Sequence, residues 1–469
     1  MQQHEWFKPL MDKLLDSYSA RIIVIDNCRY SMRPEFTVAL KKHFAVHFYK
    51  SELELRSFLR QNRGFRTLII KLPQVSYFPF DIEQSSQLIC WGEEDVVSSP
   101  ADRGEVEPKE RICSEIYTIA TEIERLLGEG KGAWGKLGYL WGKLSFLRDG
   151  LFYSTIYNNN ISLPAVERIF RDLDTKLEEG FTYFMLNHYK TLFYQSIYFE
   201  PVTIDRVLPF CRHQGFEKLA LICMDGMGFQ EWFCLKNYLK NKGISKFREM
   251  HVFALLPTVT EISRRALFSG KKNLKDLPME ALGFREYVER NMPLGQGQAQ
   301  YFFAKYPQHR WEYFTSSYVG IVFGLVDDLL HHTRGIGQDK VLLQHNLEIL
   351  LRQTELNKIV EGFLTRGFKV IITADHGSVY SRGMGIKQEK YLLSKRARRA
   401  SLFPNKHLAM EFSRKDDRLI FYENKEFLGE KCAVFAPWRG MFGSLGESGI
   451  SHGGLHLEEV IVPFVEVLT

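Results

Sequence analysis

The sequence lacks the features of disulfide-stabilised, thiolate-metal and membrane-spanning proteins. Its seven cysteines are odd in number, scattered along the chain and without a CxxC pair, which argues against a disulfide framework and a cysteine zinc site. No apolar run approaches the roughly 20 residues that a membrane-spanning helix needs. The start of the sequence, MQQHEWFKPL, has no basic segment followed by an apolar one. We therefore expect no secretory signal, no membrane partner and a cytoplasmic location.

An excess of one charge is also missing. The 62 Lys and Arg residues barely outnumber the 56 Asp and Glu residues, and the net charge is +6. Such a mildly basic chain allows a polyanionic partner but does not require one. The 45% of hydrophobic residues excludes wholesale disorder, and 469 residues are too many for one typical domain. We expect two or three folded domains.

The first part of the chain alternates between strand-like and helical segments. Short apolar runs at residues 21–26, 45–49 and 66–72 are separated by segments with helical patterns. This alternation predicts a small, mostly parallel α/β module over residues 1–92.

A phosphorylated receiver is one reading of such a module, and the residues argue against it. A receiver needs an acceptor Asp after its third strand, but that strand ends in Ile70-Lys71-Leu72-Pro73. Asp26, at the end of the first strand, is better interpreted as a turn residue. The module is thus expected to be receiver-like without a phosphoacceptor.

The middle of the chain is expected to be a linker followed by helices. Residues 93–110 are polar and acidic and contain two prolines, as an exposed linker would. Residues 111–203 carry apolar stripes at helical spacing, which predicts a helical domain. Within it, Gly130–Gly135 matches GxGxxG, but a helical segment rather than a strand precedes it. We interpret this stretch as a glycine-rich helical turn, not a phosphate-binding loop.

From residue 204 onward, strands repeatedly end in metal-ligand residue types. These ends are Asp225-Gly226, Pro257-Thr258-Val259-Thr260, Asp327-Asp328 with His331-His332, Asp375-His376 and Ser451-His452-Gly453. Because open α/β sheets place ligand sites at the carboxyl ends of their strands, these side chains are expected to converge. Clustered carboxylates repel one another unless cations bind between them. Oxygen and nitrogen ligands without thiolates fit Zn²⁺ or Mn²⁺.

These segments resemble the alkaline phosphatase superfamily, and more specifically its PglZ branch, known from bacterial phage-defence (BREX) systems. The resemblance is carried by LALICMDGMGFQEW, ALLPTVTEISRRALFSGKK, VFGLVDDLLHH, VIITADHGS and SHGGLHLEEVIVPFVEV. It implies an α/β fold, with an alkaline-phosphatase-like, mostly parallel sheet sandwiched by helices over residues 204–469. The α/β module and the helical region would precede this catalytic domain.

The resemblance also implies two divalent metal ions, with zinc first and manganese as the alternative. One would be bound by Asp225, Asp375 and His376, and the other by Asp327, His331 and His452. Asp327 is preferred to Asp328 because it follows the strand more directly, and His331 then completes the D-x-x-x-H pattern of the family. His332 and Asp328 are second choices.

The nucleophile implied by the resemblance is Thr260, which would also contact the metal ions. In related phosphodiesterases the stretch from Pro-Thr to a final Gly is as long as Pro257–Gly270, and its second Thr reacts. Thr258 and Ser263 are the rivals. Ser263 stands where those enzymes have Asn, so Arg264 or Arg265 is expected to hold the phosphate oxygens.

A basic segment follows the Asp375-His376 motif. Residues 387–399, KQEKYLLSKRARR, include Lys395, Arg396, Arg398 and Arg399, which we expect to bind phosphates of a nucleic acid or nucleotide substrate. An ordinary solvated face is the alternative reading.

The sequence thus favours a two-metal phosphodiesterase of the nuclease type, acting in bacterial defence with other proteins of the defence system. A phosphomonoesterase acting on small molecules or phosphoproteins is the alternative, and a scaffold without turnover is the third reading. Sulfatase chemistry is disfavoured because Pro257-Thr-Val-Thr260 does not supply the C/S-x-P-x-R pattern.

Overall fold

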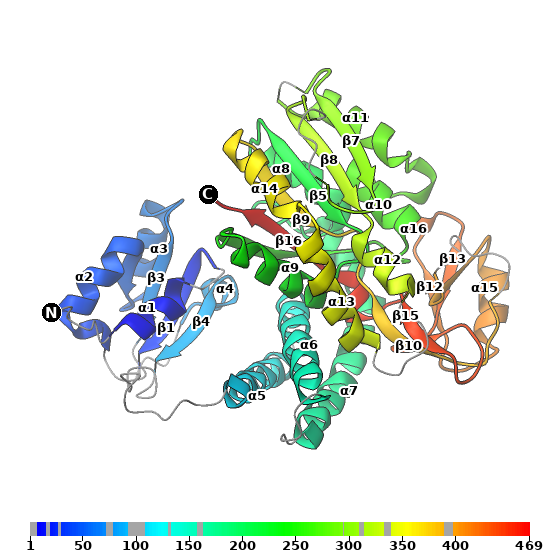
Figure 1. Cartoon of the computed structure of the whole chain (residues 1–469), viewed down its shortest axis with the longest axis horizontal. Helices are drawn as coiled ribbons and strands as arrows, with labels where there is room; N and C mark the ends of the chain where they lie inside the picture. The colour runs from blue at the N-terminus through cyan, green and yellow to red at the C-terminus, as the bar shows by residue number, and fades with distance from the viewer. Residues whose placement is uncertain are drawn as a thin grey trace. The chain divides into compact units, whose positions relative to one another are not determined.

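The chain forms two compact units, Met1–Glu107 and Pro108–Thr469, each with its own hydrophobic core (Figure 1). The computed structural model describes residues 7–15, 19–26, 30–71, 78–91, 108–129, 133–156, 163–293, 295–308, 314–332, 339–388 and 397–469. Within these ranges, no helix combines the length and apolar character needed to cross a bilayer.

The first unit is built on a four-stranded parallel sheet in the order β2-β3-β1-β4. Its strands are β1 (Arg21–Asp26), β2 (Ala45–Phe48), β3 (Thr67–Lys71) and β4 (Gln87–Trp91), and its helices are α1 (Lys8–Leu15), α2 (Pro34–His43), α3 (Glu52–Gln61) and α4 (Phe80–Gln84). Alternate residues of β1 enter different cores: Ile22 packs with Phe36 of α2, and Ile23 packs with Leu55 of α3. Both faces of the sheet are therefore covered, as a parallel sheet requires.

Asp26 has the structural role that the sequence indicated. Its carboxylate is fully buried and accepts hydrogen bonds from the backbone N–H groups of Tyr30 (3.0 Å) and Ser31 (2.8 Å). The Ser31 hydroxyl donates a third bond at 2.5 Å. These bonds close the turn after β1 and supply the hydrogen-bond partners that a buried carboxylate requires.

The second unit is built on a six-stranded sheet in the order β6-β16-β9-β5-β8-β7. Its strands are β5 (Leu219–Met224), β6 (Phe247–Phe253), β7 (Ala299–Ala304), β8 (Tyr318–Phe323), β9 (Lys369–Thr373) and β16 (Ile461–Val467). All neighbouring pairs are parallel except those of β16, which is antiparallel to both of its neighbours. The expected largely parallel α/β fold is confirmed.

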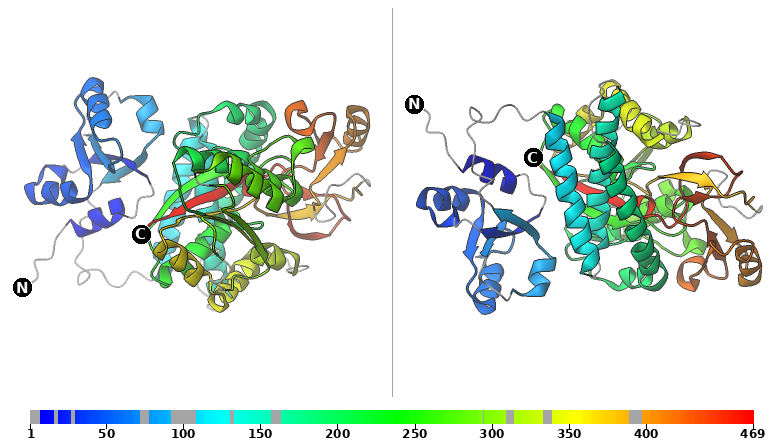
Figure 2. Two further views of the ribbon diagram at one scale, coloured as in Figure 1. Left: turned by 90° about the horizontal axis from the view of Figure 1, so that it is seen from above. Right: turned by 90° about the horizontal axis from the view of Figure 1, so that it is seen from below.

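Helices surround this sheet, and two smaller sheets lie beside it (Figure 2). The helices are α5 (Pro108–Gly128), α6 (Trp134–Ile156), α7 (Leu163–Asn187), α8 (Val207–His213), α9 (Phe229–Asn241), α10 (Thr260–Ser269), α11 (Glu280–Asn291), α12 (Leu325–His332), α13 (Asp339–Gln353), α14 (Leu356–Thr365), α15 (Lys406–Ser413), α16 (Lys425–Leu428) and α17 (Leu457–Val460). The small sheets join β10 (Val379–Gly383) to β14 (Gly440–Met441) and β15 (Ser448–Ser451), and β13 (Cys432–Phe435) to β11 (Ala400–Phe403) and β12 (Ile420–Glu423).

The helices α5–α7 belong to the second unit and do not form a domain of their own, unlike the expectation for residues 111–203. Their apolar residues join the core of the large sheet. Glycines of α6 make this possible, because a Cβ at Gly138 would lie 2.8 Å from the Ile461 side chain and one at Gly142 would lie 2.3 Å from Phe229. Gly135 is part of the same helix, so the end of the GxGxxG stretch serves helix packing.

The sheet register brings the predicted metal-ligand motifs together. Strand β5 lies between β9 and β8, and Cys223 of β5 pairs with both Thr373 and Val322. Asp225 and Asp375 each follow these paired positions by two residues. They therefore leave the sheet side by side at its carboxyl edge.

Candidate metal and nucleophile site

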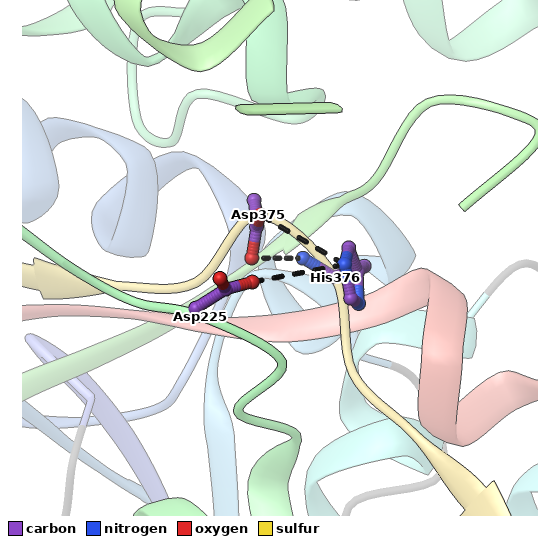
Figure 3. A group of neighbouring side chains, drawn as sticks. All are labelled: Asp225, Asp375 and His376. Carbon is purple, nitrogen blue, oxygen red and sulfur yellow. Dashed lines mark hydrogen bonds and ion pairs between the residues drawn. The ribbon is translucent and has the colours of Figure 1, made fainter. Parts of the chain in front are cut away.

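Asp225, Asp375 and His376 form a buried group at this edge (Figure 3). Each offers one ligand atom, and these atoms lie within 4.8 Å of one another. His376 Nε2 is 3.9 Å from Asp225 Oδ1 and 3.8 Å from Asp375 Oδ2. This is the set that the sequence assigned to the first metal ion.

A hydrogen bond fixes the orientation of the His376 ring and places a proton on its Nδ1. Nδ1 is 3.0 Å from the carbonyl oxygen of Gly377, and because a carbonyl can only accept, Nδ1 carries the proton. In the neutral ring, Nε2 is then the nitrogen without a proton, and it lies beside the two carboxylates. A backbone carbonyl that fixes the tautomer in this way is typical of histidines that bind metal ions.

The charges of the group favour a bound cation. Burial and the neighbouring Asp375 carboxylate raise the pKa of Asp225 to about 8, even though Arg264 opposes the shift. Burial likewise raises the pKa of Asp375. Asp225 Oδ1 and Asp375 Oδ2 are buried and receive no hydrogen bond. Two such oxygens beside an imidazole lone pair fit the donor set of a divalent ion such as Zn²⁺.

Thr260 begins helix α10 and reaches this group. Its Oγ1 lies 3.0 Å from His376 Nε2, within hydrogen-bond distance. The two rival hydroxyls are used elsewhere and are buried. Thr258 donates to the Gly454 carbonyl at 3.1 Å, and Ser263 donates to the Leu255 carbonyl at 3.2 Å. Of these three hydroxyls, that of Thr260 is the one in contact with His376.

Arg264 lies one turn after Thr260 and is bonded to the acidic group. Its Nη1 donates to Asp225 Oδ2 at 2.6 Å, lies 3.9 Å from Asp375 Oδ2, and its Nε donates to Glu280 at 3.2 Å. Arg265 points elsewhere, toward the Met279 sulfur at 3.3 Å. Of the two arginines proposed to hold phosphate, only Arg264 contacts the described metal group.

Asp327 and His452, which were predicted to bind the second metal ion, lie near Asp225 and His376 but are not part of the compact group. The backbone N–H of Asp327 donates to the Asp225 carbonyl at 3.1 Å, and the charge of Asp327 contributes to the raised pKa of Asp225. The ring of His452 stacks on that of His376, with centroids 4.2 Å apart and an interplanar angle of 12°. The side chains of His331 and His332, at the end of α12, lie outside the described part of the structure.

His452 is oriented in the same manner as His376. Its Nδ1 is 3.0 Å from the Thr258 carbonyl, so Nδ1 carries the proton. Gly453 follows at a φ of +113°, and its N–H donates to the Thr258 hydroxyl at 3.1 Å. A side chain would strain this backbone conformation, which explains the glycine after His452. Asp328, the second choice to Asp327, instead accepts from the Tyr306 hydroxyl at 2.8 Å.

The prediction that Arg399 of the basic segment binds substrate phosphates is wrong. This side chain is fully buried and paired with Glu459 at 2.8 Å, and it donates to the carbonyls of Trp438 and Gly440. It is a structural residue and is not available to a substrate phosphate. Arg398 is half-buried and pairs with Glu447. Lys395 and Arg396 lie outside the described residues.

An ionic cluster that the sequence did not reveal supports the segment carrying His452. Asp174 of α7 accepts from Arg439 at 2.7 and 2.8 Å and from the Trp438 indole at 2.9 Å, and Arg439 also reaches Glu458 at 3.1 Å. The Trp438 ring packs on that of His456, with centroids 3.8 Å apart. No local motif marks Asp174, because its partners lie more than 260 positions away in sequence.

His456 gives this cluster a pH dependence. Burial, and next Arg439, lowers its pKa to about 4, against the opposing effects of Asp174 and Glu458. Because the unfolded chain protonates this residue more readily, its contribution to stability is complete above about pH 6.5 and decreases toward pH 4. Over this pH range, we expect the free energy of unfolding to fall by up to about 3 kcal/mol more in the wild-type protein than in His456→Asn. Urea denaturation measures this difference. Equal losses in the two proteins would contradict the expectation.

Known proteins resemble this chain by sequence family and by structure. The profile of a family described as the BREX system PglZ alkaline phosphatase-like domain matches residues 204–281 and 318–467. Murine ectonucleotide pyrophosphatase/phosphodiesterase 5 aligns with 53% of this chain and 87% of its own, at 12% identity and a TM-score of 0.35. Phosphonoacetate hydrolase from Sinorhizobium meliloti, in complex with phosphonoformate, aligns with 54% of this chain and 90% of its own, at 11% identity and a TM-score of 0.32. No curated protein matches the chain in sequence.

Proposed function

We propose that this chain, a member of the PglZ family of alkaline phosphatase-like hydrolases by its residues 204–281 and 318–467, is a metal-dependent phosphodiesterase with Thr260 as its nucleophile. One observation carries the proposal. The Thr260 hydroxyl lies 3.0 Å from His376 Nε2, directly beside a buried group whose two carboxylate oxygens have no donor. A hydroxyl next to a ready ligand set is the arrangement that activates a nucleophile.

The metal ligands would be Asp225, Asp375 and His376 for one ion, with Asp327, His452 and His331 assigned to a second. Bound there, divalent cations would lower the pKa of the Thr260 hydroxyl and neutralise charge that develops on the phosphoryl oxygens. Zinc is our first choice and manganese the second, because the ligands are oxygen and nitrogen atoms.

The chain's own residues position the reacting atoms. Thr260 is the first residue of α10, so its oxygen and an attacked phosphate lie at the positive end of the helix dipole. Thr260 Oγ1 forms a bond to phosphorus while the bond to the leaving alcohol breaks, and the alcohol takes up the proton. Water then attacks the phosphothreonine, releases the phosphate monoester and restores the hydroxyl. Arg264, already beside Asp225, is placed to contact a phosphoryl oxygen.

We further propose a nucleic acid or nucleotide as the substrate and a role in bacterial defence with other proteins of such a system. The defence role is supported by the description of the matching family, which names the BREX system. The mildly basic net charge of +6 permits a polyanionic substrate.

A chromogenic pair of substrates tests the reaction class. We expect faster hydrolysis of bis(4-nitrophenyl) phosphate than of 4-nitrophenyl phosphate, and dependence of both on added Zn²⁺ or Mn²⁺. A preference for the monoester would favour the alternative, a phosphomonoesterase. Activity that survives complete chelation would reject the metal-dependent mechanism.

Asp375→Asn should separate metal binding from folding. Asn keeps the Oδ1 acceptor for the backbone N–H groups of Gly226 (3.2 Å) and His376 (3.1 Å) but removes one charged ligand. We expect Zn²⁺ affinity to fall by more than about a hundredfold, since even residues that only orient ligands account for 10- to 100-fold. The metal-free protein should be no less stable, because one of two repelling carboxylates is gone.

Competition with a chromophoric chelator measures the affinity, and thermal unfolding measures the stability. Asp328→Asn is the matched control, because this carboxylate accepts from the Tyr306 hydroxyl and pairs with Lys305 at 2.9 Å. Similar zinc affinities for Asp375→Asn and wild type would show that the site lies elsewhere.

A further inference from the structure

Strand β7 carries an exposed aromatic residue to the edge of the metal site. The strand pairs in parallel with β8, and therefore ends at the same edge of the sheet as β5 and β9. Tyr301 and Phe303 lie on one face of β7 because side chains alternate along a strand. Tyr301 packs edge-on against Phe268 of α10 at 5.1 Å. Phe303, two residues closer to the site, extends beyond this contact and is 60% exposed.

The Phe303 ring is separated from the acidic group by a single guanidinium. Arg264 Cζ lies 5.7 Å from the ring centroid, and Arg264 Nη1 lies 2.6 Å from Asp225 Oδ2. The same arginine is bonded to Glu280, next to Met279, another exposed apolar side chain at 59% exposure. Single exposed phenylalanines are common on protein surfaces, so exposure alone indicates nothing. Phe303 points to a ligand because it lies beside Arg264, the arginine placed to contact the phosphate.

We propose that Phe303 stacks on a nucleobase attached to the phosphoester being hydrolysed. The inference rests on the proposed function and names its substrate class. A phosphate contacted by Arg264 would place the sugar and base of a nucleotide over the neighbouring ring. Every nucleobase has a π face, so such stacking is strong and tolerant of sequence. The aliphatic part of an alkyl phosphoester would gain much less from a flat aromatic surface.

Two substrates that differ only in the base test the proposal. They are the 4-nitrophenyl ester of thymidine 5′-phosphate and the same ester of abasic 2-deoxyribose 5-phosphate. Stacking energies of this kind correspond to a preference of about 5- to 150-fold in kcat/KM for the base-bearing ester. Phe303→Ala should reduce this ratio to near one, and Phe303→Trp should preserve it.

Phe199→Ala is the matched control, because Phe199 is 71% exposed and, among the described residues, its ring packs edge-on against Tyr198. It should keep the wild-type ratio. A second arm measures binding without turnover: calorimetry of thymidine 5′-monophosphate and of 2-deoxyribose 5-phosphate with Zn²⁺-loaded Thr260→Ala, with and without Phe303→Ala.

The two arms distinguish failure of the inference from failure of the proposed function. If neither ester is hydrolysed but binding prefers the nucleotide and loses this preference in Phe303→Ala, the phosphodiesterase proposal fails, whereas the stacking of a nucleobase on Phe303 stands. The Phe303 proposal is overturned if the wild type hydrolyses the two esters with equal kcat/KM and the second arm shows equal affinity for the two monophosphates. It is also overturned by a preference that Phe303→Ala leaves unchanged.

Discussion

Thr260→Ala is expected to lower kcat for a chromogenic diester by at least about a thousandfold, since the loss of a covalent nucleophile removes the reaction path rather than one contact. The fold and the zinc affinity should survive, because Asp225, Asp375 and His376 keep their mutual distances without the hydroxyl. Thr260→Ser keeps an oxygen at the same place and should retain part of the activity. Steady-state kinetics at saturating Zn²⁺, with metal content measured in the same samples, checks all three statements.

Ser263→Ala is the matched control for this experiment. Ser263 lies on the same helix, but its hydroxyl donates to the Leu255 carbonyl at 3.2 Å and is fully buried. Its loss should cost about 1 kcal/mol of stability and leave kcat nearly unchanged. If Ser263→Ala is the inactive variant and Thr260→Ala is active, the nucleophile has been assigned to the wrong residue.

The metal group could be predicted from the sequence because its members follow strands of one parallel sheet. Such strands end at a common edge whatever the details of packing, so Asp225 and the Asp375-His376 pair were expected to meet. The resemblance already preferred Thr260 to Thr258, and the structure adds a physical difference between them. Both hydroxyls follow the same strand, but that of Thr258 is hydrogen-bonded to the backbone of Gly453 and Gly454.

The remaining features depend on contacts that sequence spacing does not encode. The glycines of α6 follow a helical face, but only the positions of Ile461 and Phe229 show that α6 packs against β16 and α9. Phe303 has no motif, and its importance comes from the parallel pairing of β7 with β8. In the segment 387–399, a run of cations resembles a phosphate-binding face whether its members point outward or inward. Arg399 points inward because Glu459, sixty positions later, is buried with it.

We therefore expect Arg399→Met to lower the stability of the fold, as the loss of a buried structural residue would. Both members of the Arg399–Glu459 pair are completely buried, and removing one leaves the other as an uncompensated charge, which costs about 3–5 kcal/mol. Arg398→Met is an adjacent control of the same size. Arg398 and Glu447 are about one-third exposed, and breaking such a partly solvated pair should cost about 1 kcal/mol or less.

Urea denaturation of the two variants gives the comparison, and the double variant Arg399→Met/Glu459→Gln identifies its cause. Removing both charges should recover part of the loss, because the main cost of the single substitution is the unpaired carboxylate and not the missing attraction. The Glu459 carboxylate also accepts from the N–H groups of Gly454 and His456, and Gln keeps an acceptor for them. If Arg399→Met is as stable as Arg398→Met but binds oligonucleotides more weakly, Arg399 contacts the substrate and is not a buried structural residue.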